Sequence, residues 1–133
     1  MVTFTDPEIA RVGLNEAEAK GKGMRYEITR YELAELDRAI TDGATAGFIK
    51  VLTVPGKDRI LGATIVGARA GDILGEFTLA MTNGLGLGAI LKTIHPYPGW
   101  SEAAKAVSGE WRRAHLSPRL LGLSERFHRW MRG

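Results

Sequence analysis

The amino-acid sequence predicts an α+β fold, a two-layer sandwich in which an antiparallel sheet carries helices on one side. Two apolar runs rich in β-branched residues, 47–54 and 59–66, are joined by Pro55-Gly56-Lys57-Asp58, which predicts an antiparallel hairpin. Beyond residue 70 the apolar residues recur at spacings of three and four, which indicates helices. Because strands and helices are segregated along the chain, the predicted class is α+β.

Shorter elements are expected ahead of the hairpin. The extended segments among them cover residues 2–5, 24–31 and 33–40. Residues 6–8 include a proline and are expected to form a turn or to start a helix. Asn15 is a residue type that caps helix N-termini, so a helix is expected over residues 16–20, where glycines then end it.

The second half of the chain is expected to be mostly helical. Ile73, Phe77 and Ala80 share one helix face, which predicts a helix over residues 70–83. Two prolines and a glycine within residues 95–99 indicate a fixed loop. Further helices are expected over residues 89–93, 104–114 and about 120–130, with a proline at 118 between the last two.

The composition narrows the class of protein. The chain has 133 residues, of which 44% are apolar and 25% charged, and this mixture is typical of a single globular domain. It contains no cysteine, which excludes disulfides, thiolate metal ligands and a cysteine nucleophile within these residues. No apolar run approaches the roughly 18 residues of a membrane span, and the N-terminus lacks the pattern of a signal peptide. A cytoplasmic protein without a metal site is expected.

The basic character of the chain is concentrated at its end. Residues 110–133 hold six arginines and two glutamates, so of the net charge of +3 the first 109 residues contribute −1. They offer no basic stripe for nucleic acid. We therefore expect a domain over residues 1–109 and a basic helical extension over residues 110–133. A helix that packs across a dimer is favoured for this extension over one that lies on an anionic membrane.

Three stretches of the chain resemble one protein family. Residues 2–14 resemble the opening of the dimerisation domain in the family of dihydrolipoamide dehydrogenase, glutathione reductase and mercuric reductase. Residues 47–51 and 59–71 resemble that domain's central hairpin and the start of the next helix. Residues 94–103, IHPYPGWSEA, resemble its active-site loop. The stretches occur in family order, so the chain is identified as a member of the class I pyridine nucleotide-disulfide oxidoreductases.

The resemblance implies one domain of a larger oxidoreductase that uses FAD and NAD(P). In this family hydride passes from the nicotinamide to the flavin, and electrons then pass to a redox-active disulfide and its substrate. The C-terminal domain forms the two-fold interface of a homodimer and completes the partner's active site. The chain alone is expected to bind neither cofactor, so the 133 residues should be colourless and inactive.

The resemblance also implies the site residues. In the disulfide-reducing members a histidine precedes the loop proline and a glutamate follows five positions later; Tyr97 and Glu102 hold these positions here and are the expected catalytic residues. A tyrosine, with a pKa of about 10, is a poor general base at neutral pH. The family residue before this proline turns its main-chain carbonyl toward the partner's flavin through a cis bond. Tyr97 and Pro98 are therefore the expected cofactor contacts, joined by a cis peptide bond.

Structural interpretations stand beside these functional ones. Tyr97 is also suited to an amphipathic contact at an interface, and a helix dipole favours a carboxylate at Glu102 whatever its chemistry. His95 is interpreted as structural, and His115 and His128 as solvated residues of basic helices.

The remaining alternatives concern the glycines and the function as a whole. The glycines at 84, 86 and 88 lack the strand-before, helix-after context of a dinucleotide fingerprint, so no phosphate site is expected there. The alternative to an enzyme domain is a stand-alone module that dimerises or docks a partner and catalyses nothing.

Overall fold

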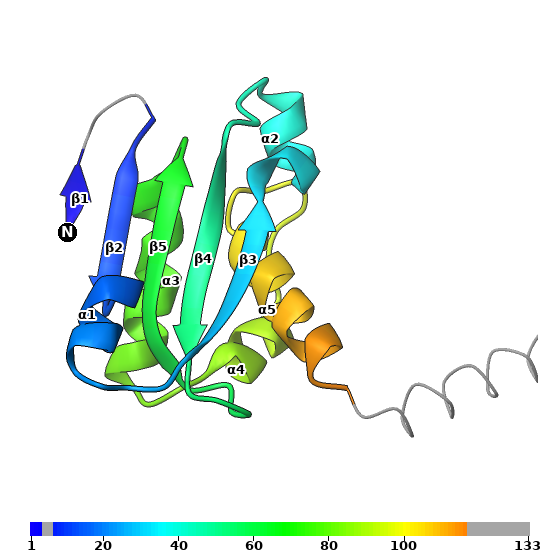
Figure 1. Cartoon of the computed structure of the whole chain (residues 1–133). Helices are drawn as coiled ribbons and strands as arrows, with labels where there is room; N and C mark the ends of the chain where they lie inside the picture. Colours follow the sequence, from blue (N-terminus) through cyan, green and yellow to red (C-terminus); the bar gives the residue numbers. More distant parts are fainter. Residues whose placement is uncertain (4–6, 117–133) are drawn as a thin grey trace, which may run out of the picture.

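The structure is a computed structural model that describes residues 1–3 and 7–116. Five strands form one antiparallel sheet in the order β1-β2-β5-β4-β3 (Figure 1). The strands are β1 (Val2–Thr3), β2 (Ile9–Gly13), β3 (Glu27–Glu32), β4 (Gly47–Thr53) and β5 (Ile60–Gly67). The helices are α1 (Glu16–Gly21), η1 (Leu33–Glu35, a 3-10 turn), α2 (Asp37–Thr41), α3 (Ala70–Thr82), α4 (Leu87–Lys92) and α5 (Glu102–Ala114). The predicted α+β class is confirmed.

The hairpin of β4 and β5 forms the centre of the sheet, as predicted. The two strands pair from Gly47 opposite Gly67 to Thr53 opposite Ile60, with a shift of register between Leu52 and Thr53. Both glycines have a positive φ, 130° and 143°, and a Cβ on Gly47 would lie 2.0 Å from the carbonyl oxygen of Val66. The strands therefore approach at this end in a way that only glycine allows.

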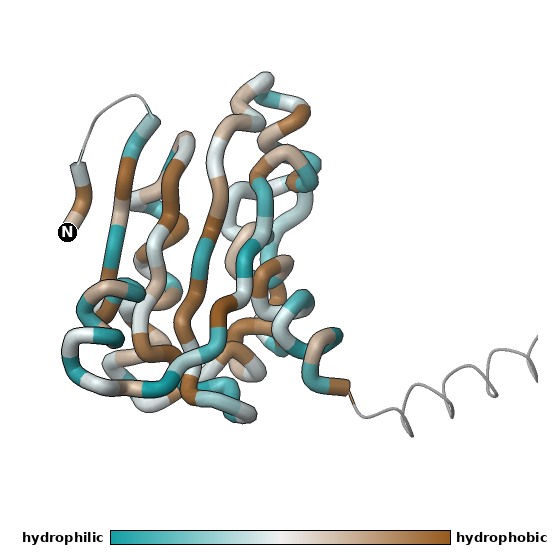
Figure 2. Tube along the Cα trace, in the orientation of Figure 1, coloured by the Kyte–Doolittle hydropathy of each residue, from teal (hydrophilic) through white to brown (hydrophobic). Residues whose placement is uncertain are grey.

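Helices cover one face of the sheet and enclose the core. Helix α3 packs on β2 and β5, α5 packs on β3 and β4, and α4 packs against α5 (Figure 1). Alternate residues of the strands point into this layer, as Ile49, Val51 and Ile65 do, and brown segments of the trace face one another there (Figure 2). Phe77 of α3 is among the largest fully buried side chains. Alternation by two in the strands and by three to four in the helices is what brings these residues together.

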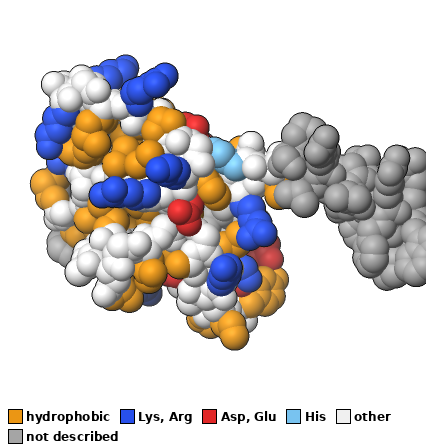
Figure 3. Space-filling model, turned by 90° about the horizontal axis from the view of Figure 1, so that it is seen from below, with side chains coloured by type: hydrophobic (Ala, Val, Ile, Leu, Met, Phe, Trp, Pro, Cys, Tyr) orange, Lys and Arg blue, Asp and Glu red, His pale blue; other side chains and the backbone are white. Residues whose placement is uncertain are grey.

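The other face of the sheet carries a mixed surface. Lys50 makes an ion pair of 2.7 Å with Glu16 of α1, and Arg30 lies 3.9 Å above the ring of Phe48. Asn15 caps α1 as predicted: its Oδ1 accepts from the backbone of Glu18 at 2.8 Å in a capping box. Figure 3 shows basic side chains interspersed with apolar and acidic ones at the lower end of the molecule.

In the first half of the chain one expected segment is wrong and one strand was not predicted. Residues 33–40 are η1 and α2 rather than an extended segment, because Leu33, Leu36 and Ala39 recur every third residue and are all buried only in helical turns. Residues 9–13, for which no element was predicted, form β2 between β1 and β5. Glu8 starts no helix; it directly precedes β2.

Other boundaries differ by a few residues. Strand β1 ends at residue 3, and residues 4–6 lie outside the described part. Helix α3 agrees with its prediction, whereas α4 and α5 each begin two residues earlier than expected, at Leu87 and Glu102. The basic extension beyond residue 116 and His128 also lie outside the described residues.

Candidate functional site

The candidate site is the loop of residues 93–101, which joins α4 to α5. It has no regular secondary structure, and it lies beside α2 (Figure 1). The Tyr97–Pro98 peptide bond is cis, as predicted. Tyr97 is 70% exposed, so its side chain stands on the surface rather than in the core.

Helix α2 holds the loop through three polar contacts. The Tyr97 hydroxyl donates to Oδ2 of Asp37 at 2.7 Å, and Nη1 of Arg38 donates to the carbonyl oxygen of Pro98 at 3.2 Å. Nε1 of Trp100 donates to Oδ2 of Asp42 at 3.0 Å. The same Asp42 oxygen accepts from Nε of Arg38 at 2.9 Å, so the Arg38 and Trp100 contacts are joined, and the Tyr97–Asp37 bond stands beside them. The shape of the loop is therefore set by a helix that lies about 60 residues earlier in the chain.

Electrostatics keep the Tyr97 phenol protonated. The hydrogen bond that it donates to Asp37, reinforced by the charge of that carboxylate, raises the pKa of Tyr97. Conversely, hydrogen bonds from Arg38 and Trp100 lower the pKa of Asp42. Tyr97 is accordingly a hydrogen-bond donor at neutral pH and is unsuited to accept a proton.

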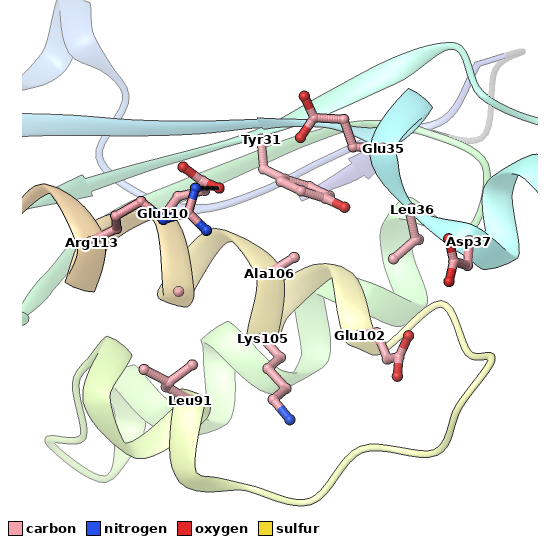
Figure 4. A pocket seen from close by; sticks show the side chains of 11 residues that line it. Tyr31, Glu35, Leu36, Asp37, Leu91, Glu102, Lys105, Ala106, Glu110 and Arg113 are labelled. Atoms are coloured by element: carbon pink, nitrogen blue, oxygen red, sulfur yellow. Dashed lines mark ion pairs between the residues drawn. The ribbon is translucent and has the colours of Figure 1, made fainter. Parts of the chain in front are cut away.

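Glu102 is the first residue of α5 and lies apart from the Tyr97 network. The Tyr97 hydroxyl is bonded to Asp37, not to Glu102, so the structure does not join the two predicted catalytic residues directly. Among the described residues the Glu102 carboxylate takes part in no hydrogen bond or ion pair. It lines a surface hollow of about 440 Å³ between β3, the segment of η1 and α2, and α5 (Figure 4).

His95 lies inside the fold, in agreement with a structural role. Its side chain is 4% exposed, and Nε2 lies 2.7 Å from Oε1 of Glu76 on α3. This contact ties the start of the loop to α3.

His115 is less free than expected. Its side chain is 26% exposed, and it contacts Glu27 at 2.6 Å, so the description as merely solvated is incomplete.

The glycines at the start of α4 allow Asp58 of the hairpin loop to approach the helix closely. Oδ2 of Asp58 accepts from the amide of Gly88 at 3.0 Å, and its carbonyl oxygen accepts from Leu87 at 3.0 Å. A Cβ on Gly86 would lie 2.4 Å from the Asp58 carboxylate carbon. An acidic side chain thus occupies the position that a phosphate would need.

The described ranges contain no acidic or histidine cluster suited to a metal ion. Within the same residues no helix is long and apolar enough to cross a membrane.

The sequence did not predict the residues that hold the loop, Asp37, Arg38 and Asp42. Nor did it predict Tyr31 of β3, which lines the hollow beside Glu102. They lie in or next to the segment that was expected to be extended. The i,i+4 spacing of Arg38 and Asp42 was the available signal, because opposite charges at this spacing pair on a helix.

Comparison with known proteins identifies the family. Residues 1–107 match the family model of the pyridine nucleotide-disulphide oxidoreductase dimerisation domain. The chain is 40% identical over 104 residues to mitochondrial dihydrolipoyl dehydrogenase of Dictyostelium discoideum, which covers 78% of the chain and 21% of that protein. It is 39% identical over 101 residues to dihydrolipoyl dehydrogenase of Staphylococcus aureus, covering 76% of the chain and 22% of that protein.

Solved structures share the fold. The HOCl-induced flavoprotein disulfide reductase RclA of Escherichia coli superimposes with a TM-score of 0.76 at 23% identity, over 82% of this chain and 25% of that one. LpdA of Mycobacterium tuberculosis also gives 0.76, at 20% identity over 88% and 25% of the two chains. The chain spans about a fifth of the length of the dihydrolipoyl dehydrogenases it matches. It belongs to the family of dimerisation domains of the pyridine nucleotide-disulphide oxidoreductases.

Proposed function

We propose that this domain works within an FAD- and NAD(P)-dependent oxidoreductase, where it forms the homodimer and completes the partner's active site with residues 94–102. The carrying observation is the loop itself: it lies at the surface, is held by hydrogen bonds with α2 and leaves Tyr97 exposed. A preformed turn of this kind positions its groups without ordering cost on contact.

The chain's own groups suggest how it would meet the flavin. The carbonyl of Pro98 is already occupied by Arg38, whereas no described residue donates a hydrogen bond to the carbonyl of Tyr97. The Tyr97 carbonyl is therefore proposed as the main-chain contact to the cofactor, with the adjoining Pro98 ring as a packing contact and Glu102 as the ionisable group beside the loop. The Tyr97 phenol stays bonded to Asp37. Since Asp58 fills the α4 glycine turn, the phosphates of FAD and NAD(P) are to be held elsewhere in the subunit.

Apolar residues mark the proposed two-fold surface. Leu79 of α3 is 63% exposed, Leu85 is 49% exposed and Ile94 is 95% exposed. Leu79 and Leu85 also line a small apolar hollow between α3 and α4. Exposed apolar side chains grouped on one side of the helical layer are typical of a protein–protein contact surface. A cytoplasmic location, a domain boundary at 109/110 and a lack of nucleic-acid partners remain predictions from the sequence.

The test uses the complete subunit that contains this chain, compared with the Tyr97→Phe, Glu102→Gln and Asp72→Asn variants. Asp72 is an exposed carboxylate of α3 that makes no contact with the loop residues and serves as the control. Flavin reduction by NADH or NADPH is followed by stopped flow, and turnover is followed with a dithiol–disulfide pair such as lipoamide. We expect normal flavin reduction throughout, a loss of turnover of about tenfold or more in Glu102→Gln and less than about threefold in Tyr97→Phe.

Two results would count against the proposal. Loss of turnover in Tyr97→Phe with normal flavin reduction would make the phenol essential and refute its role as a main-chain and packing residue. A reading frame without an upstream glycine-rich Rossmann segment, together with a subunit that holds no flavin, would favour the stand-alone module instead.

A further inference from the structure

The hollow beside Glu102 is a built feature of the domain. Its volume is about 440 Å³. Its lining comes from β3, η1, α2, α4 and α5: Tyr31, Glu35, Leu36, Asp37, Leu91, Glu102, Lys105, Ala106, Gly109, Glu110 and Arg113. Figure 4 shows Tyr31 extending over α5 toward Leu36, with the charged side chains arranged around it.

Tyr31 is a buried side chain with a free polar end. The residue is 8% exposed and belongs to the hydrophobic core. Its hydroxyl is directed into the hollow between Leu36 and Ala106 (Figure 4), and no described residue forms a hydrogen bond with it. The hydroxyl is therefore open to the hollow, where a bound ligand can donate a hydrogen bond to it or accept one from it.

The charges around the hollow favour a positively charged ligand. Four carboxylates line it, from Glu35, Asp37, Glu102 and Glu110, against the cations Lys105 and Arg113. Arg113 lies 3.4 Å from Glu110, so this pair is internally compensated. Glu35 and Glu102 take part in no ion pair among the described residues, which leaves an excess of negative charge.

Apolar side chains complete the lining. Leu36 is buried beneath the surface, and Leu91 and Ala106 contribute further carbon atoms to the wall (Figure 4). This combination suits a group with a carbon stem and a charged head, in the way that long basic side chains rest their stems on apolar surface. Burial of the ring, followed by the charges of Glu35 and Asp37, raises the pKa of Tyr31, so its phenol remains able both to donate and to accept.

We propose that this hollow is a binding site for an alkyl guanidinium or ammonium group, with the Tyr31 hydroxyl and the Glu35 and Glu102 carboxylates as its acceptors. The ligand is either a small amine or the side chain of an arginine or lysine from another polypeptide segment. A guanidinium brings several N–H donors in one plane, which matches several acceptors around one space better than a neutral ligand does. The proposal does not depend on the redox activity of the parent protein.

The experiment titrates the isotope-labelled 133-residue chain and follows backbone amide shifts by NMR. The probes are butylguanidinium, the matched neutral butylurea, and N-acetylarginine amide, which presents the same head from a peptide backbone. The variants are Tyr31→Phe, which keeps the buried ring, and Glu35→Gln, which keeps the side-chain shape. Asp72→Asn is the control, since it removes one negative charge from an exposed site on α3.

The expected result is a saturable shift of amides within residues 102–110 with butylguanidinium and none with butylurea. Tyr31→Phe and Glu35→Gln should each raise the dissociation constant by about fivefold, and Asp72→Asn by less than about twofold. Tighter binding of N-acetylarginine amide would assign the site to a side chain, and tighter binding of butylguanidinium to a small amine. Equal effects of all three variants, or shifts spread over every acidic surface, would overturn the proposal.

Discussion

His115 joins the end of α5 to strand β3 through both nitrogens of its ring. Nδ1 lies 2.7 Å from the carbonyl oxygen of Trp111, and Nε2 lies 2.6 Å from Oε2 of Glu27. The ring also stacks on that of Trp111, with centroids 4.3 Å apart. A carbonyl and a carboxylate only accept hydrogen bonds, so both nitrogens must carry a hydrogen for both contacts to form. The arrangement therefore selects the imidazolium form.

This contact predicts a pH-dependent stability. The hydrogen bond to the Trp111 carbonyl and the bond to Glu27 raise the pKa of His115, and bonds from Gly56 and His115 lower the pKa of Glu27. The raised histidine stabilises the fold below its unfolded pKa of about 6.5, and this stabilisation is lost as the pH rises through the higher folded value. The lowered glutamate stabilises the fold above its unfolded pKa, and its effect is lost as the pH falls through the folded value.

Urea denaturation of the wild type and His115→Gln should therefore differ most near pH 5.5. The two midpoints should converge at about pH 8.5, well above the unfolded histidine pKa. Arg113→Gln on the same helix serves as the control and should show no such convergence. A difference that is constant from pH 5.5 to 8.5 would contradict the imidazolium assignment.

At the same scale, the sequence indicates the candidate loop but not the contacts that hold it. The resemblance pointed to Tyr97, Pro98 and Glu102, and the structure places them on one loop and the adjoining helix turn. The sequence did not predict Asp37 as the partner of Tyr97, because the two residues are 60 positions apart and meet only through tertiary packing. Hydrogen bonds between distant segments leave no periodic pattern in a sequence.

At the scale of the elements, the hairpin loop packs closely against the start of α4 at a glycine. A Cβ at Gly86 would lie 2.4 Å from the Asp58 carboxylate carbon and 2.6 Å from its carbonyl oxygen. Gly75, inside α3, has no atom within 4 Å of the corresponding position. We expect Gly86→Ala to lower the free energy of unfolding by about 1–3 kcal/mol. Gly75→Ala should raise it by up to about 1 kcal/mol through helix propensity.

Chemical denaturation of both variants measures these differences. The two changes add the same methyl group, one at the N-cap of α4 and one inside α3. Equal effects of the two substitutions would show that the approach of Asp58 to α4 does not limit this position.

Elements with a strong period could be predicted from the sequence, and those shaped by their neighbours could not. The hairpin and α3 have clear alternation or helical spacing, and both agree with the prediction. Strand β2 is only five residues long; it is a strand because β5 offers it a complete ladder from Ile9 to Gly13. In residues 33–40 the apolar residues Leu33, Leu36 and Ala39 recur every third position. The charged residues between them made the segment resemble an alternating strand.

The whole molecule is expected to self-associate through its helical layer. Glutamate substitution at Leu79, which is 63% exposed on α3, should reduce the dimer by placing a charge in the proposed apolar contact. The matched control is Ile28→Glu, since Ile28 is 45% exposed on β3 and lies on the opposite face of the sheet. Sedimentation at about 100 μM should show dimer for wild type and Ile28→Glu, and monomer for Leu79→Glu, if the interface approaches the standard size of about 1,600 Å².

Two sedimentation results would contradict the proposed dimer contact. A monomeric wild type at that concentration would count against a dimer held by this domain alone. Dimers that resist Leu79→Glu but not Ile28→Glu would move the contact to the open face of the sheet.

The network between α2 and the loop has a consequence for chimaeric proteins. Asp37, Arg38 and Asp42 fix the loop from outside its own sequence. A graft of residues 93–101 into a homologous scaffold would then transfer the sequence of the loop without its conformation, unless the recipient carries compatible residues at those three positions. Helix α2 and the loop form a single transplantable unit made of two separate segments, and exchanges of function between homologues should move both together.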